Sequence, residues 1–264
     1  MQNRRFGRLG WDASEVGYGM WGMAGWTGSD DEQSLAALER AVALGCTFFD
    51  TAWAYGDGRS ERLLGEILRR HRDKRLSAAT KIPPKNRRWP GRAEDRIDEV
   101  FPADHIREYT EKSLTNLGID TIDLQQFHVW SDAWALDDLW QRAVSDLKTE
   151  GLVRGFGISV NRWQPANVLR ALDTDLVDSV QVVYNIFDQS PEDMLLPACQ
   201  ERDIAVIARV PFDEGSLTGS TVIPGMRKPA HVNENMRISD SQPLSDDLMS
   251  ELRRHRWERT FDLA

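Results

Sequence analysis

Four side chains that can exchange protons or stabilise charge stand near the ends of short apolar runs. Asp50 lies in CTFFDT, Tyr55 follows it, Lys81 lies in LSAATKI and His128 lies in TIDLQQFHV. A carboxylate, a phenol, an ammonium group and an imidazole can share acid and base chemistry if they meet in space. Each one alone also has an ordinary structural role, as a turn cap, a loop anchor, a lysine at a rim or a histidine in the core. The fold decides whether they meet.

Short apolar runs alternate with segments of helical period along the chain. After a hairpin over residues 4–18, eight strands are predicted to begin at Val16, Cys46, Leu76, Thr121, Val153, Ser179, Ile204 and Thr221. Helices are predicted over residues 30–44, 61–70, 104–117, 137–149, 164–172, 191–202, 228–237 and 244–255. This alternation is typical of a parallel sheet, and eight such units indicate an α/β protein with a (β/α)8 barrel. No G-x-G-x-x-G segment follows the first strand, which argues against a Rossmann fold.

Two segments depart from this regular order. Residues 211–220 (PFDEGSLTGS) join the seventh and eighth predicted strands without a helical period, although a parallel crossover normally contains a helix. We therefore expect a missing segment at the junction of residues 219 and 220, either a true deletion or a disordered stretch absent from the sequence. The second is favoured, because a barrel without its seventh helix would expose a broad apolar face. Residues 83–103 form a polar insertion that is expected to lie over the mouth of the barrel.

The composition is that of an ordinary globular domain. The chain has 264 residues, close to the roughly 250 of one barrel, so a single domain is expected over residues 1–264. Its formal net charge of −9 argues against nucleic acid or an anionic membrane as partner. No apolar run approaches the ~20 residues of a membrane span, and the polar start is unlike a signal peptide. We expect a cytoplasmic protein in which Cys46 and Cys199 are buried free thiols.

The ordered pattern FFDTA-x-x-YG, followed by a lysine and then a histidine at strand ends, resembles the aldo-keto reductase superfamily. The resemblance extends from the N-terminal hairpin to the IPG-x-(R/K) segment near the end of the chain. It implies an active site at the C-terminal ends of the barrel strands. It also implies that a small-molecule aldehyde or ketone is reduced to an alcohol with NADP(H), with NAD(H) as the alternative, and without a metal.

The resemblance further implies a role for each of the four side chains. Tyr55 would donate the proton that the carbonyl oxygen needs once the carbon has accepted hydride. Because the pKa of a free tyrosine is about 10, Lys81 would lower the pKa of Tyr55, and Asp50 would hold Lys81 charged and in place. A neutral His128 would hydrogen-bond the carbonyl oxygen and stabilise the charge that develops on it.

Residues after the later strands resemble the family's contacts to the nicotinamide. Ser159, Asn161 and Gln181 carry groups suited to a carboxamide, although Val160 here separates the family's usual Ser-Asn pair. Arg209 stands where the family commonly has an aromatic residue stacked on the nicotinamide. A planar guanidinium can also stack on a ring, and a buried structural ion pair is its alternative role.

Other positions resemble the family's contacts to the rest of the cofactor. They are Gly215, Ser216 and Leu217 for the pyrophosphate, Arg227 and Lys228 for a 2′-phosphate, and Glu234 and Asn235 for the adenine. The basic pair precedes a predicted helix whose N-terminus favours anions, so NADPH is expected over NADH. An ordinary turn and a solvated basic segment are the structural alternatives.

Tryptophan is unusually frequent, with ten residues, and several lie on predicted rim loops. Those expected to line the substrate pocket are Trp21, Trp26, Trp89 and Trp130. Indole walls suit apolar or aromatic carbonyls and sugars. Trp140 and Trp163 are expected in the core instead. From the resemblance alone, the C-terminal tail is expected to bring Trp257 or Phe261 to the pocket.

Two other functions are weighed against carbonyl reduction. A cofactor-sensing regulatory subunit with a reductase-like fold and little turnover would keep the same four residues, so only turnover separates it from an enzyme. A barrel hydrolase with a metal is disfavoured, because the sequence has no clustered set of histidines and carboxylates.

Overall fold

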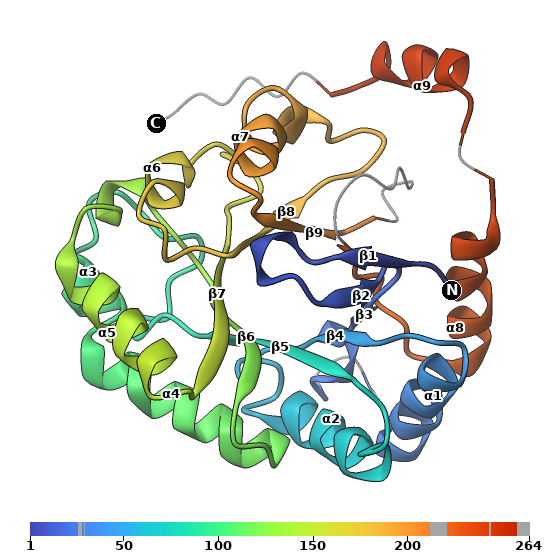
Figure 1. The fold of residues 1–264 in the computed structure, drawn as a ribbon, viewed down its shortest axis with the longest axis horizontal. Coiled ribbons are helices and arrows are strands. Elements are labelled where there is room, and N and C mark those ends of the chain that lie inside the picture. Colours follow the sequence, from blue (N-terminus) through green and yellow to red (C-terminus); the bar gives the residue numbers. More distant parts are fainter. Residues whose placement is uncertain (26–27, 29, 212–220, 243, 258–264) are drawn as a thin grey trace.

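Eight parallel strands form one sheet at the centre of the protein (Figure 1). The computed structural model describes residues 1–25, 28, 30–211, 221–242 and 244–257. The strands of this sheet are β3 (Tyr18–Gly19), β4 (Phe48–Asp50), β5 (Ser77–Ile82), β6 (Ile122–Phe127), β7 (Val153–Ser159), β8 (Ser179–Val183), β9 (Ala205–Arg209) and β10 (Thr221–Val222). Each strand pairs with the next one along the chain, as the alternating pattern predicts.

The first and last strands of the sheet meet and close it into a barrel. Parallel bridges join Val16 to Val222 and Gly19 to Gly225. A Cβ atom at Gly19 would lie 2.6 Å from the carbonyl oxygen of Ile223, so the two backbones can approach this closely only because residue 19 is glycine. The predicted (β/α)8 barrel is confirmed.

Helices follow the strands and surround the barrel (Figure 1). They are α1 (Asp31–Ala43), α2 (Arg59–Arg70), α3 (Ile97–Val100), α4 (Ala103–Leu117), α5 (Asp138–Thr149), α6 (Leu169–Leu172), α7 (Leu195–Glu201), α8 (Pro229–Met236) and α9 (Asp246–Arg253). The helix α1 begins where predicted because the Asp30 carboxylate accepts a hydrogen bond from the Gln33 N–H at 2.9 Å. Short α3 lies within the insertion over residues 83–103.

Two helices are shorter than the sequence predicts. The segment 164–172 is helical only in α6, where the Asp132 carboxylate accepts the N–H groups of Arg170 and Ala171 and so fixes a late start. The segment 191–202 is divided into a 3-10 turn, Ser190–Glu192, and the helix α7. In both cases a side chain or a turn forms hydrogen bonds with backbone groups that would otherwise pair within a longer helix.

The seventh βα unit is described only in part. Every earlier strand of the barrel is followed by a helix, whereas between β9 and β10 the structure describes only residues 210 and 211. The junction of residues 219 and 220 lies outside the described residues, so the choice between a deletion and an absent stretch stays a prediction.

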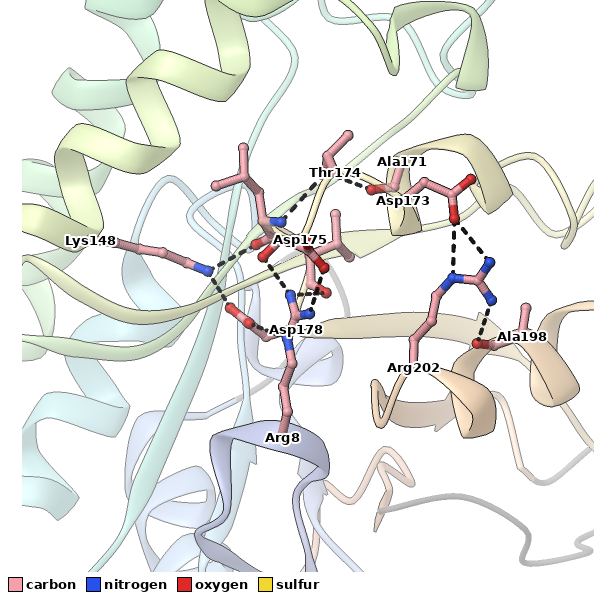
Figure 2. Close-up of polar contacts among 11 residues, drawn as sticks. Arg8, Lys148, Ala171, Asp173, Thr174, Asp175, Asp178, Ala198 and Arg202 are labelled. Atoms are coloured by element: carbon pink, nitrogen blue, oxygen red, sulfur yellow. Dashed lines mark hydrogen bonds and ion pairs between the residues drawn. The ribbon is translucent and has the colours of Figure 1, made fainter.

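An N-terminal hairpin closes the bottom of the barrel. Its strands β1 (Asn3–Arg5) and β2 (Asp12–Ser14) pair antiparallel, and the Phe6 ring stacks on Phe48 inside the barrel with centroids 5.3 Å apart. Arg8 reaches from the hairpin to Asp178, with Nε 2.9 Å from the Asp178 Oδ1 atom. Lys148 donates to the other oxygen of Asp178 at 2.6 Å (Figure 2). This end of the barrel is therefore sealed by apolar packing and a buried ionic cluster.

Alternation along the strands places the site at the opposite end. Side chains two residues apart on a strand face the same way, and Phe48, Ala79 and Leu124 belong to the cluster packed within the barrel. Continuing by two residues on these strands leads to Asp50, Lys81 and Gln126. These polar side chains therefore share the interior, one layer nearer to the C-terminal ends of the strands.

No helix in the part of the chain described by the structure is both long and apolar enough to span a membrane.

Candidate active site

A cavity of about 600 Å³ opens at the C-terminal ends of the strands. Its lining includes all four side chains that the sequence predicts to be catalytic. The residues around it are Gly19, Met20, Trp21, Asp50, Tyr55, Lys81, Trp89, His128, Ser159, Gln181, Arg209, Val210, Pro211, Ile223 and Gly225. We call it the main cavity. It lies at the barrel end where (β/α)8 enzymes carry their active sites.

Lys81 and Asp50 form a buried ion pair in the floor of this cavity. The lysine Nζ atom lies 2.8 and 2.7 Å from the two oxygens of Asp50 and donates to the Thr51 carbonyl at 2.8 Å. The amide of Gln126 adds a long contact of 3.5 Å to Asp50. Lysine carries three donors, so these contacts satisfy the ammonium group and hold it in one position.

Tyr55 stands beside this ion pair on the loop that follows β4. Its ring centroid is 5.2 Å from the Lys81 Nζ atom and 5.7 Å from the centroid of the His128 ring. Burial is the main influence on the pKa of Tyr55 and raises it above its ordinary value, while the positive charge of Lys81 lowers it. The predicted effect of Lys81 is present, but in the free protein burial outweighs it, so Tyr55 is a protonated acid at neutral pH.

His128 lies at the end of β6 and faces the same cavity. Its backbone N–H donates to the Ile82 carbonyl at 3.1 Å, which continues the pairing with β5. Burial, followed by the charges of Lys81 and Arg209, holds the pKa of His128 well below its usual range. The imidazole is therefore neutral, and its Nδ1 atom is buried without a hydrogen-bond partner.

Two of the three predicted carboxamide contacts line the main cavity. Ser159 and Gln181 are both there, and both amide atoms of Gln181 are buried without a partner. Buried amides are normally paired, so Gln181 fits a ligand that carries a donor and an acceptor, such as a carboxamide. Asn161 lies instead beside a smaller neighbouring cavity, and its Oδ1 atom accepts the Trp163 N–H at 2.9 Å.

Arg209 projects into the main cavity from the end of β9. One of its terminal nitrogens donates to the Val160 carbonyl at 3.0 Å, and its Nε atom is buried without a partner. Burial lowers the pKa of Arg209 below its ordinary value, but an arginine guanidinium stays protonated in proteins. No ion pair of Arg209 occurs among the described residues, so the alternative of a buried structural ion pair has no support in that part of the chain.

The predicted contacts to the phosphates and adenine lie away from this cavity. Arg227 and Lys228 precede α8, and Lys228 is the N-cap residue of that helix. Glu234 and Asn235 belong to α8 itself. None of the four lines the main cavity, but Gly225 does, and it leads directly into this segment. The predicted pyrophosphate clamp, Gly215, Ser216 and Leu217, lies outside the described residues.

The predicted tryptophans divide between the two cavities. Trp21 and Trp89 line the main cavity and are 57% and 49% exposed. Trp130 is buried and borders the smaller cavity. Trp26 lies outside the described residues.

Two other tryptophans differ from expectation. The prediction of Trp163 in the core is wrong: it is 44% exposed and borders the smaller cavity, because the turn after β7 directs it outward. Trp257 stacks on Phe187 with ring centroids 5.2 Å apart and is not among the residues that line either cavity. Trp140 is buried as predicted. Phe261 lies outside the described residues.

Several residues that line the main cavity were not predicted from the sequence. Met20, Val210, Pro211 and Ile223 are apolar and follow no functional pattern. Gln126 is not in the lining but contacts Asp50; it was also missed, although it lies on the same face of β6 as His128, two residues earlier. Its position in the strand period was the signal that could have identified it. No group of three or more metal-ligating side chains occurs in the described ranges.

Comparison with known proteins agrees with this geometry. A model described as the aldo/keto reductase family matches residues 15–221. The chain is 33% identical over 218 residues to the uncharacterized oxidoreductase YqkF of Bacillus subtilis, covering 83% of this chain and 67% of that protein. It is 28% identical over 225 residues to an NADH-specific methylglyoxal reductase of Escherichia coli, covering 80% of this chain and 68% of that protein.

Solved structures show the same fold. An aldo-keto reductase from Klebsiella pneumoniae, in complex with NADPH, superposes with a TM-score of 0.76 and 23% identity, covering 100% of this chain and 99% of that one. In sequence alignments, however, the chain covers only about two thirds of the length of its curated relatives. The share is 67% for YqkF and 61% to 63% for three other relatives.

Proposed function

The chain belongs to the aldo/keto reductase family, and on that premise we propose that it reduces small aldehydes or ketones to alcohols with a nicotinamide cofactor. The observation that carries the proposal is the meeting of Tyr55, Lys81, Asp50 and His128 around one cavity at the end of the barrel. A bound nicotinamide would supply the hydride. The protein would then have to orient the carbonyl group and deliver a proton to its oxygen.

In this proposal Tyr55 is the general acid and His128 orients the substrate. A protonated tyrosine can donate to the oxygen on which negative charge develops. The neutral imidazole of His128 offers a further hydrogen bond to the same oxygen, which stabilises that charge in a site shielded from water. Lys81, fixed by Asp50, provides a positive charge beside the phenol and so stabilises the tyrosinate that remains after proton transfer.

Gln181 and Ser159 would bind the carboxamide of the cofactor, and Arg209 would stack on its ring. Arg227 and Lys228, at the start of α8, would bind a 2′-phosphate, which favours NADPH over NADH. Glu234 and Asn235 would contact the adenine. Among the relatives, one printed name specifies NADH and another NADP(+), and two solved structures contain NADPH or NADP, so the preference is best measured as the ratio of the two dissociation constants.

The test is turnover by the wild type and by Tyr55→Phe, followed by loss of NADPH absorbance with an activated aromatic aldehyde. General acids typically contribute about 10²- to 10⁴-fold, so Tyr55→Phe should lower kcat at least about 100-fold. NADPH binding, followed by fluorescence, should change little. Tyr109→Phe is the matched control: this tyrosine lies on α4 and packs against Trp53, and its variant should retain full activity.

Two outcomes would contradict the proposal. Unchanged turnover in Tyr55→Phe would remove the tyrosine from the chemistry. A wild type that binds NADPH tightly but reduces no carbonyl would indicate a cofactor-sensing subunit instead of an enzyme.

A further inference from the structure

A second cavity of about 210 Å³ joins the main cavity beside the candidate catalytic residues. The two share Trp89, His128, Ser159 and Arg209 in their linings. We call the second cavity the side arm. Because His128 borders both, a substrate whose carbonyl group contacts His128 could extend its remaining atoms into the side arm.

Three residues that border the side arm carry a buried nitrogen atom without a partner. The Nε1 atom of Trp130, the Nε atom of Arg209 and the Nδ1 atom of His128 are each buried without a hydrogen bond. Indole and guanidinium nitrogens can only donate. Unpaired buried donors are costly, so a ligand acceptor atom that reached the Trp130 or Arg209 nitrogen would be stabilised.

The charges around the side arm are positive. Arg162 and Arg209 both border it, and the charge of Arg162 adds to the lowering of the Arg209 pKa. Arg162 lies over the Trp163 ring, with Cζ 5.4 Å from the ring centroid, and forms no ion pair within the described ranges. Among the described residues no carboxylate borders the side arm. Within the same part of the chain, Asp50 is the one carboxylate that lines the main cavity, and both of its oxygens contact Lys81.

The remaining walls of the side arm are apolar, so they indicate which chemical group of a ligand would lie against them. Trp89, Pro90, Val129 and Trp163 line the side arm together with His128 and Arg162. A hydrocarbon or aromatic linker would contact these surfaces favourably. Donors and positive charge at one end, with indole walls between, match a carboxylate joined to a carbonyl group through an apolar linker.

We propose that the side arm binds a carboxylate, so that the preferred substrates are carbonyl compounds that also carry an acid group. This inference rests on the proposed function only for the chemistry at the carbonyl group; the carboxylate site itself follows from the side arm. Arg162 acts here as a specificity-determining residue at the mouth, and Arg209 contributes the deeper guanidinium.

The primary experiment measures binding, which does not require turnover. The probes are 4-(hydroxymethyl)benzoate and its methyl ester, titrated onto the full chain with NADP⁺ present and followed by tryptophan fluorescence. A hydrogen bond to a charged group corresponds to about 10- to 100-fold in affinity. We expect the acid to bind at least about 10-fold more tightly than the ester, and Arg162→Gln to remove most of this difference. Arg162→Lys, which keeps the charge, should retain much of it.

Arg170→Gln is the matched control, since Arg170 lies on α6 and borders neither cavity; it should leave the ratio of acid to ester unchanged. The matching kinetic ratio compares kcat/KM for 4-carboxybenzaldehyde and methyl 4-formylbenzoate, and it should follow the binding ratio across the variants.

Equal binding of acid and ester by the wild type, or a ratio that Arg162→Gln leaves unchanged, would overturn the inference. The proposed function fails separately. If the acid binds through Arg162 but neither aldehyde is reduced, the carboxylate site stands and the reductase does not. If both aldehydes are reduced with equal kcat/KM, the reductase activity stands and the carboxylate site does not.

Discussion

Replacement of Asp178 by alanine should destabilise the protein strongly, because this carboxylate joins three elements at the bottom of the barrel. Its oxygens accept from the Arg8 Nε atom at 2.9 Å and from the Lys148 Nζ atom at 2.6 Å (Figure 2). They also accept from the Phe156 backbone N–H at 2.8 Å. The Asp178 side chain is 6% exposed, whereas Arg8 and Lys148 are 26% and 23% exposed. The variant would leave two partly buried cations and one buried N–H without this acceptor.

The expected size of the effect follows from these contacts. Removing one partner of a buried ionic cluster costs about 3–5 kcal/mol, and we take about 4 kcal/mol. With an unfolding entropy of about 2.1 cal/mol/K per residue, the 264 residues give about 0.55 kcal/mol/K. The melting temperature should therefore fall by about 7 °C. Asp178→Asn keeps one acceptor for the backbone N–H and should lose about half as much.

The assay is thermal and urea unfolding followed by circular dichroism, with Asp175→Ala as the matched control. Asp175 also faces Arg8, at 3.6 Å, but its side chain is 95% exposed. Exposed ion pairs contribute little, and replacement by alanine at the left-handed backbone of Asp175 adds only a local cost, so this variant should lose clearly less stability than Asp178→Ala. Equal losses in the two variants, or a loss below about 1 kcal/mol in Asp178→Ala, would refute the argument from burial.

Three further predictions concern pH, thiols and the barrel seam. Because the pKa of Tyr55 is raised and that of His128 is lowered, kcat for reduction should stay level from about pH 6 to 9; a profile with a break near the ordinary histidine pKa would contradict this. Burial raises the pKa of both cysteine thiols to about 12, so a thiol reagent at pH 8 should label neither in the folded protein and both in urea. Gly19→Ala places a Cβ atom 2.6 Å from a backbone oxygen of the facing segment and should cost about 1–3 kcal/mol in urea unfolding, whereas Gly225→Ala, which meets nothing within 4 Å, should cost much less.

The barrel and the meeting of the four candidate catalytic residues could be predicted because both depend on periodicity. Strand alternation fixes which side chains share the interior, and parallel order brings all C-terminal strand ends to one rim. Asp50, Lys81 and His128 then follow from their positions at three strand ends.

Features of the loops could not be predicted in this way. Trp163 lies at the surface because the Asn161 side chain accepts a hydrogen bond from the Trp163 backbone N–H. The spacing of apolar residues does not predict such a local contact. The net shift in the pKa of Tyr55 depends on how completely its neighbours exclude water. That is a property of the assembled cavity rather than of any segment. The side arm likewise arises from four segments that are distant in sequence.

The seam between the first and last strands also sets conditions for biosynthesis. The Thr221 hydroxyl donates to the Ser14 carbonyl, a contact between residues 207 positions apart. A nascent chain emerging from the ribosome must therefore carry two unsatisfied strand edges at least until residue 221 has been translated. Contacts of such long range slow folding, and open edges invite pairing with other chains. Cellular yield should thus respond to chaperone supply more strongly than equilibrium stability alone would suggest.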